Sequence, residues 1–221
     1  MGFDSDQVST VTFDSYSTLV DVGAVEKALA AHVDDPQPVS KLWRARSLDY
    51  TFVANAIGAY QPFYEMNRDA LHYALDVDGV DISTSERDET LAVYHEFDVF
   101  ADARDDIERF RDREYDCFVV SNGDPEMPES MTDHAGIGDI IEDTISADKL
   151  RTFKPAAEIY RHAAAHRNTD RRNRPCDCWL VRRHWRTTRR DAGRLGESKI
   201  NTVGALRSRP RSHHRDVLRA G

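Results

Sequence analysis

The chain has 221 residues, of which 40% are hydrophobic and 31% are charged, so it is long enough to bury a core and polar enough to be globular. Its apolar runs fall well short of the roughly 18 residues that a membrane-spanning helix needs, and residues 1–10 lack the basic and apolar regions of a secretory signal. Three cysteines do not make a disulfide framework, and we therefore expect a cytoplasmic protein without a membrane partner.

The formal net charge of −9 is unevenly distributed along the chain. Residues 1–166 contain 14 Lys and Arg against 34 Asp and Glu, whereas residues 167–221 contain 16 against 5, so the two parts carry −20 and +11. The acidic residues are 27 Asp and 12 Glu. A dense carboxylate surface repels itself at low salt and is screened at high salt, which favours a halophilic, salt-adapted protein. An ordinary acidic protein is the alternative.

The first half of the chain reads as one strand followed by helices. Residues 8–14 form a β-branched strand, and helices are predicted over residues 23–33, 40–60, 63–75, 85–94 and 101–113. Ser40 can cap the second of these helices. Five apolar side chains fall on one face of it: Leu42, Ala45, Leu48, Phe52 and Ala56.

Strands and helices alternate in the next part of the chain. A strand over residues 115–121 is followed by a helix over 126–134, a strand over 143–146 and a helix from Lys154 to about residue 165. This order predicts an α/β fold with a Rossmann-like parallel sheet. Residues 1–21 and 100–166 are expected to form the α/β core, and the helix-only residues 22–99 an inserted helical cap.

Three polar clusters lie at or near the ends of predicted strands: Asp14 with Thr18, Ser121 with Asn122, and Lys154. Each cluster alone is a common turn or helix-capping sequence. Because open α/β sheets bind ligands beyond the carboxyl ends of their strands, we expect the three clusters to share a cleft.

These clusters sit in recognisable motifs. Residues 13–21 read FDSYSTLVD, residues 120–123 read VSNG, and residues 153–155 read FKP. In this order and spacing they resemble the first three motifs of the haloacid dehalogenase superfamily. The resemblance covers about residues 8–166 and implies the fold of that superfamily, with Asp14 as the nucleophile.

The residue two positions after the nucleophile separates the branches of that superfamily. Its phosphatases carry a second aspartate there, which acts as general acid and base on the leaving group, whereas this chain has Tyr16. Tyrosine at this position resembles the type II L-2-haloacid dehalogenases. The segment LWRARSLDY at residues 42–50 resembles the cap helix of those enzymes, and Phe63 and Tyr160 match as well.

The resemblance implies that the chain hydrolyses small L-2-haloacids to 2-hydroxy acids through an aspartyl-ester intermediate. It implies catalytic roles for Asp14, Thr18, Arg44, Ser121, Lys154 and Tyr160. It implies substrate-binding roles for Tyr16, Leu48, Phe63 and Asn122. The partners would be a short 2-halo carboxylic acid and water, with a homodimer left open. No cofactor and no metal are expected, because a halide leaves without a proton and the substrate carries little charge.

The resemblance stops after about residue 167, and no counterpart of the fourth family motif can be assigned. Residues 167–221 contain fifteen arginines. A basic nucleic-acid arm is one explanation. A zinc site from Cys176, Cys178 and His184 is another, although the spacing is poor for structural zinc. A reading-frame shift is the explanation we favour. The rival functions are therefore a phosphatase on a small phosphoester, which Tyr16 argues against, and a non-catalytic nucleic-acid binder, which we do not favour.

Overall fold

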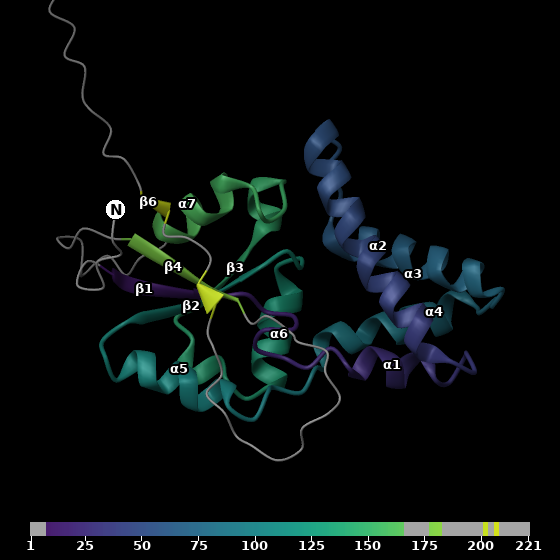
Figure 1. Cartoon of the computed structure of the whole chain (residues 1–221), viewed down its shortest axis with the longest axis horizontal. Helices are drawn as coiled ribbons and strands as arrows, with labels where there is room; N and C mark the ends of the chain where they lie inside the picture. The colour runs from purple at the N-terminus through teal and green to yellow at the C-terminus, as the bar shows by residue number, and fades with distance from the viewer. Residues whose placement is uncertain (1–7, 166–176, 183–200, 203–205, 208–221) are drawn as a thin grey trace, which may run out of the picture.

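The computed structural model describes residues 8–165, 177–182, 201–202 and 206–207, and these residues contain a mostly parallel sheet (Figure 1). The parallel strands, in spatial order, are β3 (Asp143–Ser146), β2 (Asp116–Ser121), β1 (Val8–Phe13) and β4 (Asp177–Arg182). The short strands β5 (Asn201–Thr202) and β6 (Leu206–Arg207) pair antiparallel with β4. The predicted α/β fold with a parallel sheet is confirmed.

Helices cover both faces of this sheet. The helices in the chain from residue 100 onward are α5 (Ala103–Arg111), α6 (Glu126–His134) and α7 (Ala157–Ala165), and they pack on the sheet. Cys117 and Val119 of β2 belong to the core cluster that contains Ile107 of α5. Their neighbours on the strand point to the other face, where Phe118 packs in a cluster with Ile159 of α7. Burial on both faces explains why β2 reads as a continuous apolar run rather than an alternating one.

A group of helices lies to one side of the sheet in Figure 1 and comes from the chain between β1 and α5. These helices are α1 (Ala24–Leu29), α2 (Pro36–Ile57), α3 (Phe63–Asp78) and α4 (Thr84–Ala92), followed by the 3-10 turn η2 (Val93–His95). Two further 3-10 turns, η3 (Gly138–Ile140) and η4 (Ala147–Leu150), flank β3. No helix in the described part of the chain is long and apolar enough to cross a membrane.

Helix α2 differs from its prediction at its start and in its orientation. It begins at Pro36 and is capped by Asp35, whose Oδ1 accepts a hydrogen bond from the Gln37 backbone N–H at 3.4 Å, so the predicted cap at Ser40 is wrong. Its inward face includes small polar side chains whose hydrogen bonds are satisfied inside the helix pair. Ser47 donates to Asn67 Oδ1 at 2.7 Å, for example.

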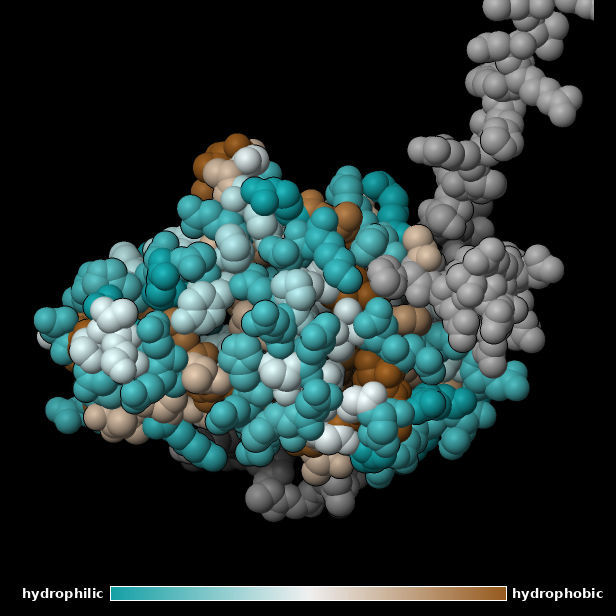
Figure 2. All heavy atoms as spheres, turned by 180° about the vertical axis from the view of Figure 1, so that it is seen from behind, coloured by the Kyte–Doolittle hydropathy of each residue, from teal (hydrophilic) through white to brown (hydrophobic). Residues whose placement is uncertain are grey.

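The apolar face predicted for α2 points largely outward. Of its five residues, Leu48 and Phe52 are each 50% exposed, Ala45 and Ala56 are exposed, and Leu42 is half-buried. Two apolar residues outside that predicted face, Val53 and Ile57, are 55% and 70% exposed. Figure 2 shows a hydrophobic group projecting from an otherwise mostly hydrophilic face, at the height where the end of α2 protrudes in Figure 1. Trp43 instead is fully buried, and its indole N–H donates to the Asn67 carbonyl at 2.9 Å.

Strand β4 lies inside the segment 167–221 that the sequence pattern set apart from the core. It pairs in parallel with β1, with Thr12 opposite Leu180 and Phe13 opposite Val181. Cys178 lies in this strand. Cys176, His184 and most of the arginine-rich segment lie outside the described residues, and so do the proposed zinc site and the proposed basic arm.

Candidate active site

A cavity of about 440 Å³ lies where the carboxyl ends of β1 and β2 meet helix α2. It brings together residues from all three predicted motifs and from the helical segment 22–99. The predicted site residues that line it are Asp14, Tyr16, Thr18, Arg44, Leu48, Phe63, Asn122 and Lys154. The lining residues that sequence reasoning did not single out are Ser17, Val22, Lys41, Ala45, Ser47 and Tyr94.

The carboxylate of Asp14 is held from two sides. The Lys154 ammonium donates to Asp14 Oδ1 and also to the Val120 carbonyl, and Thr18 donates to Asp14 Oδ2 at 3.4 Å. The Lys154 side chain is 4% exposed and that of Asp14 is 17% exposed. A charge so deeply buried needs a partner, and the ion pair supplies one while fixing the direction of the carboxylate.

A tight loop after β1 carries Asp14 and its neighbours. The backbone N–H groups of Thr18, Leu19 and Val20 all point to the Ser15 carbonyl, at 3.3, 2.9 and 3.4 Å, and the Ser17 N–H donates to the Val20 carbonyl at 3.1 Å. Within this loop Ser17 has a φ of 62°, in the left-handed region. The hydrogen bonds fix the loop as one unit, which brings Thr18 back to the side of Asp14.

Ser121 shapes the neighbouring loop rather than lining the cavity. It is fully buried, its Oγ accepts from the Gly123 N–H at 3.0 Å, and it lies 3.0 Å from Ser15 Oγ. Asn122 lines the cavity, and its Oδ1 accepts from the Lys154 backbone N–H at 2.7 Å. The second motif thus ties the first motif to the third.

The segment before Lys154 is held by a residue that sequence reasoning missed. Asn55 of α2 accepts from Thr152 Oγ1 and from the Phe153 N–H, each at 2.9 Å, and donates to the Phe153 carbonyl at 2.8 Å. Asn55 belongs to none of the sequence motifs and is an ordinary polar residue of a helix. Its partners can therefore be identified only from the folded structure.

Helix α3 is also joined to the sheet side of the molecule, through Asp124. Its Oδ1 accepts from the Phe63 N–H at 2.8 Å and its Oδ2 from the Tyr64 N–H at 3.1 Å, which caps α3 and fixes Phe63. Burial raises the pKa of Asp124, while these two hydrogen bonds act in the opposite direction.

Arg44 is the arginine of α2 that reaches the cavity. Its Nη2 donates to Ser17 Oγ at 2.9 Å. Arg46 instead pairs with Asp49 at 3.3 Å and lies over the Tyr73 ring, 4.8 Å from its centroid, and it does not line the cavity. Of these two arginines, only Arg44, the one that the resemblance implies, lines the cavity.

Aromatic rings form one wall of the cavity. The Tyr16 ring is stacked with Phe63 at 6.5 Å between centroids and meets Tyr94 edge-on at 5.2 Å. The Tyr16 hydroxyl is buried and has no hydrogen-bond partner among the described residues. Burial first, and then the nearby Tyr94, Asp124 and Asp14, raise the pKa of Tyr16. A phenol in this setting is a poorer proton donor than a free tyrosine.

Two predicted site residues, Ser121 and Tyr160, do not line this cavity. Tyr160 is half-buried on α7 and is not among the lining residues. In the described ranges, no group of three or more His, Cys, Asp or Glu side chains is arranged to hold a metal ion.

The sequence pattern of the haloacid dehalogenase-like hydrolases matches residues 8–181. The chain belongs to this family. The match passes residue 166, where the resemblance read from the motifs ended, and reaches into β4. The strand that continues the sheet beyond β1 is therefore part of the family match.

Curated relatives and solved structures of this family extend the comparison. The chain is 27% identical over 203 residues to (S)-2-haloacid dehalogenase 1 of Pseudomonas sp. (strain CBS-3), covering 90% of this chain and 84% of the relative. The crystal structure of a dehalogenase is similar with a TM-score of 0.68 and 27% identity, over 72% of this chain and 71% of that chain. An L-2-haloacid dehalogenase from Xanthobacter autotrophicus with chloropropionic acid covalently bound has a TM-score of 0.67 and 27% identity, over 72% of this chain and 64% of that chain.

Proposed function

We propose that the chain hydrolyses small L-2-haloacids to 2-hydroxy acids. The observation that carries the proposal is one cavity in which a carboxylate fixed by Lys154 and Thr18 shares the space with the Arg44 guanidinium and an aromatic wall. The relatives described above, which are named haloacid dehalogenases, point to the same reaction.

The first step would be a displacement at carbon. A carboxylate oxygen of Asp14 forms a bond to the halogen-bearing carbon from the rear, and the carbon–halogen bond breaks, with its electron pair leaving on the halide. No proton is needed on the leaving group, so the absence of an acidic residue at position 16 is no obstacle. The positive charge of Arg44 stabilises the negative charge that develops on the halogen.

The second step would hydrolyse the ester. Water attacks the carbonyl carbon of the Asp14 ester, and the bond from that carbon to the ester oxygen breaks. The oxygen leaves as the hydroxyl of a 2-hydroxy acid of inverted configuration, the Asp14 carboxylate is regenerated with an oxygen from water, and one proton is released. Ser121 and Asn122 hold the loops around Asp14 and Lys154 in place through both steps. We also propose a catalytic role for Tyr160 of α7, as the resemblance implies. The residues 22–99, as a cap, exclude bulk water from the cavity.

Halide release tests this function directly. We expect chloride release from L-2-chloropropionate by the wild-type chain, and at least a thousandfold loss in Asp14→Asn. Mass spectrometry during turnover should find an ester on Asp14. Magnesium-dependent release of phosphate from a phosphoester, with no chloride release, would instead establish the phosphatase alternative.

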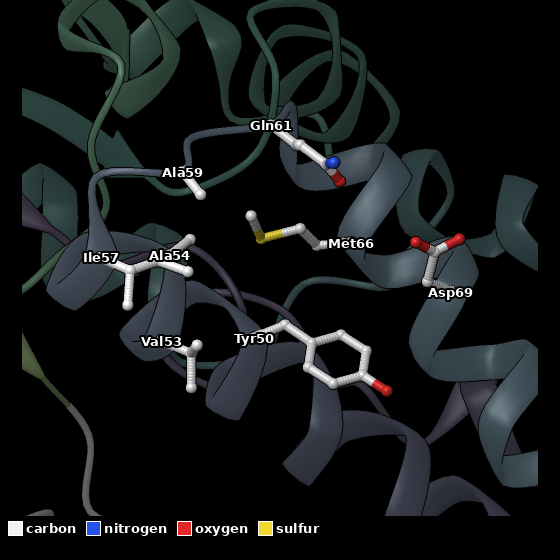
Figure 3. A pocket seen from close by; sticks show the side chains of 8 residues that line it. All are labelled: Tyr50, Val53, Ala54, Ile57, Ala59, Gln61, Met66 and Asp69. Atoms are coloured by element: carbon white, nitrogen blue, oxygen red, sulfur yellow. The ribbon is translucent and has the colours of Figure 1, made fainter.

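We also propose that the chain forms a homodimer through the exposed face of α2. An apolar cavity of about 420 Å³ opens there, as Figure 3 shows, next to the exposed side chains of Val53 and Ile57. Its lining consists of Tyr50, Val53, Ala54, Ile57, Ala59, Gln61, Met66 and Asp69. Exposed apolar surface of this kind is typical of interaction sites, and a second copy would cover it.

Light scattering after size exclusion tests the dimer. Ile57→Lys should give a monomer, because it places a charge in the apolar contact. Asp105→Asn on the exposed side of α5 makes the same change in net charge and should leave the mass unchanged. A monomeric wild type contradicts the dimer.

We propose a cytoplasmic, salt-adapted protein, on the basis of the −20 balance of residues 1–166 and the hydrophilic face in Figure 2. We propose no nucleic-acid partner, since this part of the surface would repel phosphates.

A further inference from the structure

We infer that Ser17 is a positioning residue, which holds the Arg44 guanidinium in place, in the cavity that Asp14 also lines, before substrate binds. The inference rests on the proposed function, because it assigns Ser17 a part in stabilising the departing halide. Ser17 lies three residues after Asp14, and both Ser17 and Arg44 line the cavity.

The backbone of Ser17 is in a conformation that disfavours serine. Its φ of 62° lies in the left-handed region, which is unfavourable for a residue with a Cβ and costs glycine almost nothing. The loop imposes this conformation, since the Ser17 N–H donates to Val20 O and the three following N–H groups converge on Ser15 O. A glycine would satisfy the same loop with less strain, so the fold alone gives no reason for a serine here.

The side chain of Ser17 supplies a reason. Its hydroxyl oxygen accepts the hydrogen bond from Arg44 Nη2 at 2.9 Å. Arg44 comes from α2 and reaches the cavity on a long side chain with several rotatable bonds, whereas Ser17 stands on a loop fixed by four hydrogen bonds. Joining the flexible charge to the rigid loop limits the rotamers that Arg44 can adopt.

A guanidinium fixed in this way is useful to the reaction. Charge develops on the halogen only as the carbon–halogen bond breaks, and a positive group that is already oriented need not reorganise at that moment. Because Ser17 and Asp14 belong to the same loop, the Arg44 charge is set relative to the nucleophile itself. Ser17 therefore acts through Arg44, and it forms no bond in the reaction.

The test uses variants that change strain and hydrogen bonding separately. Ser17→Gly removes both the strain and the hydroxyl, so its melting temperature should be no lower than that of the wild type, while kcat falls about tenfold. Ser17→Ala keeps the strain and should lose both stability and kcat. Ser17→Asn, which tolerates a positive φ and offers an oxygen to Arg44, should recover most of the kcat. The loss should be in kcat more than in KM, and larger for 2-chloropropionate than for 2-bromopropionate, because chloride is the poorer leaving group.

Glu114→Gly is the matched control. Glu114 also has a φ of 62° but lies exposed beyond the end of α5, outside the cavity lining, so the variant relieves the same kind of strain and should leave kcat unchanged. A Ser17→Gly variant with the kcat of the wild type for both substrates overturns the inference and leaves the proposed function standing.

A wild type that releases no halide overturns the proposed function, and a calorimetric titration with bromide then tests the role of Ser17. Equal bromide affinity in the wild type and Ser17→Gly overturns the positioning role, and weaker affinity in Ser17→Gly supports it.

Discussion

At the scale of single residues, the structure separates side chains with chemistry from side chains that arrange them. Asp14, Thr18 and Lys154 are predictable from the sequence, because they follow strands whose carboxyl ends meet at one edge of a parallel sheet. The contacts of Ser17 and Asn55 are not, because each joins a residue of helix α2 to a loop, at a position that no strand end specifies. Nothing in the local pattern indicates such contacts.

The Tyr16 hydroxyl, which lacks a hydrogen-bond partner within the described part of the chain, leads to a prediction on stability and catalysis. A buried polar group without a hydrogen-bond partner destabilises the folded chain, so Tyr16→Phe should raise the free energy of unfolding by about 1 kcal/mol. The ring still stacks on Phe63, so halide release should be retained. Urea unfolding and initial-rate measurements check both parts. A loss of activity above a hundredfold would mean that the hydroxyl takes part in the reaction.

Cys117 provides a prediction on reactivity. It is fully buried in β2, and burial raises the pKa of its thiol to about 12 from an ordinary value of 9.0. Since the thiolate is the reactive form, the thiolate fraction at pH 8 falls about a thousandfold. Iodoacetamide at pH 8 should therefore leave Cys117 unmodified in the folded chain and alkylate it in urea, as read by peptide mapping. Rapid alkylation of Cys117 without denaturant would contradict its burial.

At the scale of elements, α2 is the part that sequence reasoning described least well. Its position was predicted, but the apolar face was misjudged, because the inward positions include polar residues such as Ser47 and Thr51. Those side chains bond to the backbone of their own helix or, for Ser47, to Asn67 of α3, so they are buried without loss. A hydrophobicity pattern cannot detect that compensation.

The contact between α2 and the segment before Lys154 gives a prediction at this scale. Asn55→Ala removes three hydrogen bonds next to Lys154, so we expect a loss of about 2 kcal/mol in unfolding free energy and a roughly tenfold lower kcat. Tyr60→Phe is the control, because it removes only the hydrogen bond to Asp148 in the same region. It should lower stability without lowering kcat. Equal kcat in both variants would leave Asn55 with a purely structural role.

At the scale of the whole molecule, the charge pattern decides how the protein responds to salt. The −20 balance of residues 1–166 predicts mutual repulsion that added salt screens. The melting temperature and the rate of halide release should therefore both rise between 0.1 and about 2 M KCl. Sucrose at equal osmolality is the control, since it leaves charges unscreened. A melting temperature that stays flat or falls with KCl would identify an ordinary acidic protein.

Arg44 and Asn55 lie eleven residues apart on one unbroken helix, which is close to three full turns, so both point the same way. Deleting a single residue between them would rotate one side chain by about 100° around the helix axis relative to the other. Arg44 could then no longer bond Ser17 while Asn55 bonds the segment before Lys154. We therefore expect the insertion or deletion of one residue between these two positions to abolish halide release. The helical spacing between Arg44 and Asn55 thus sets the position of the loop after β1 relative to the segment before Lys154.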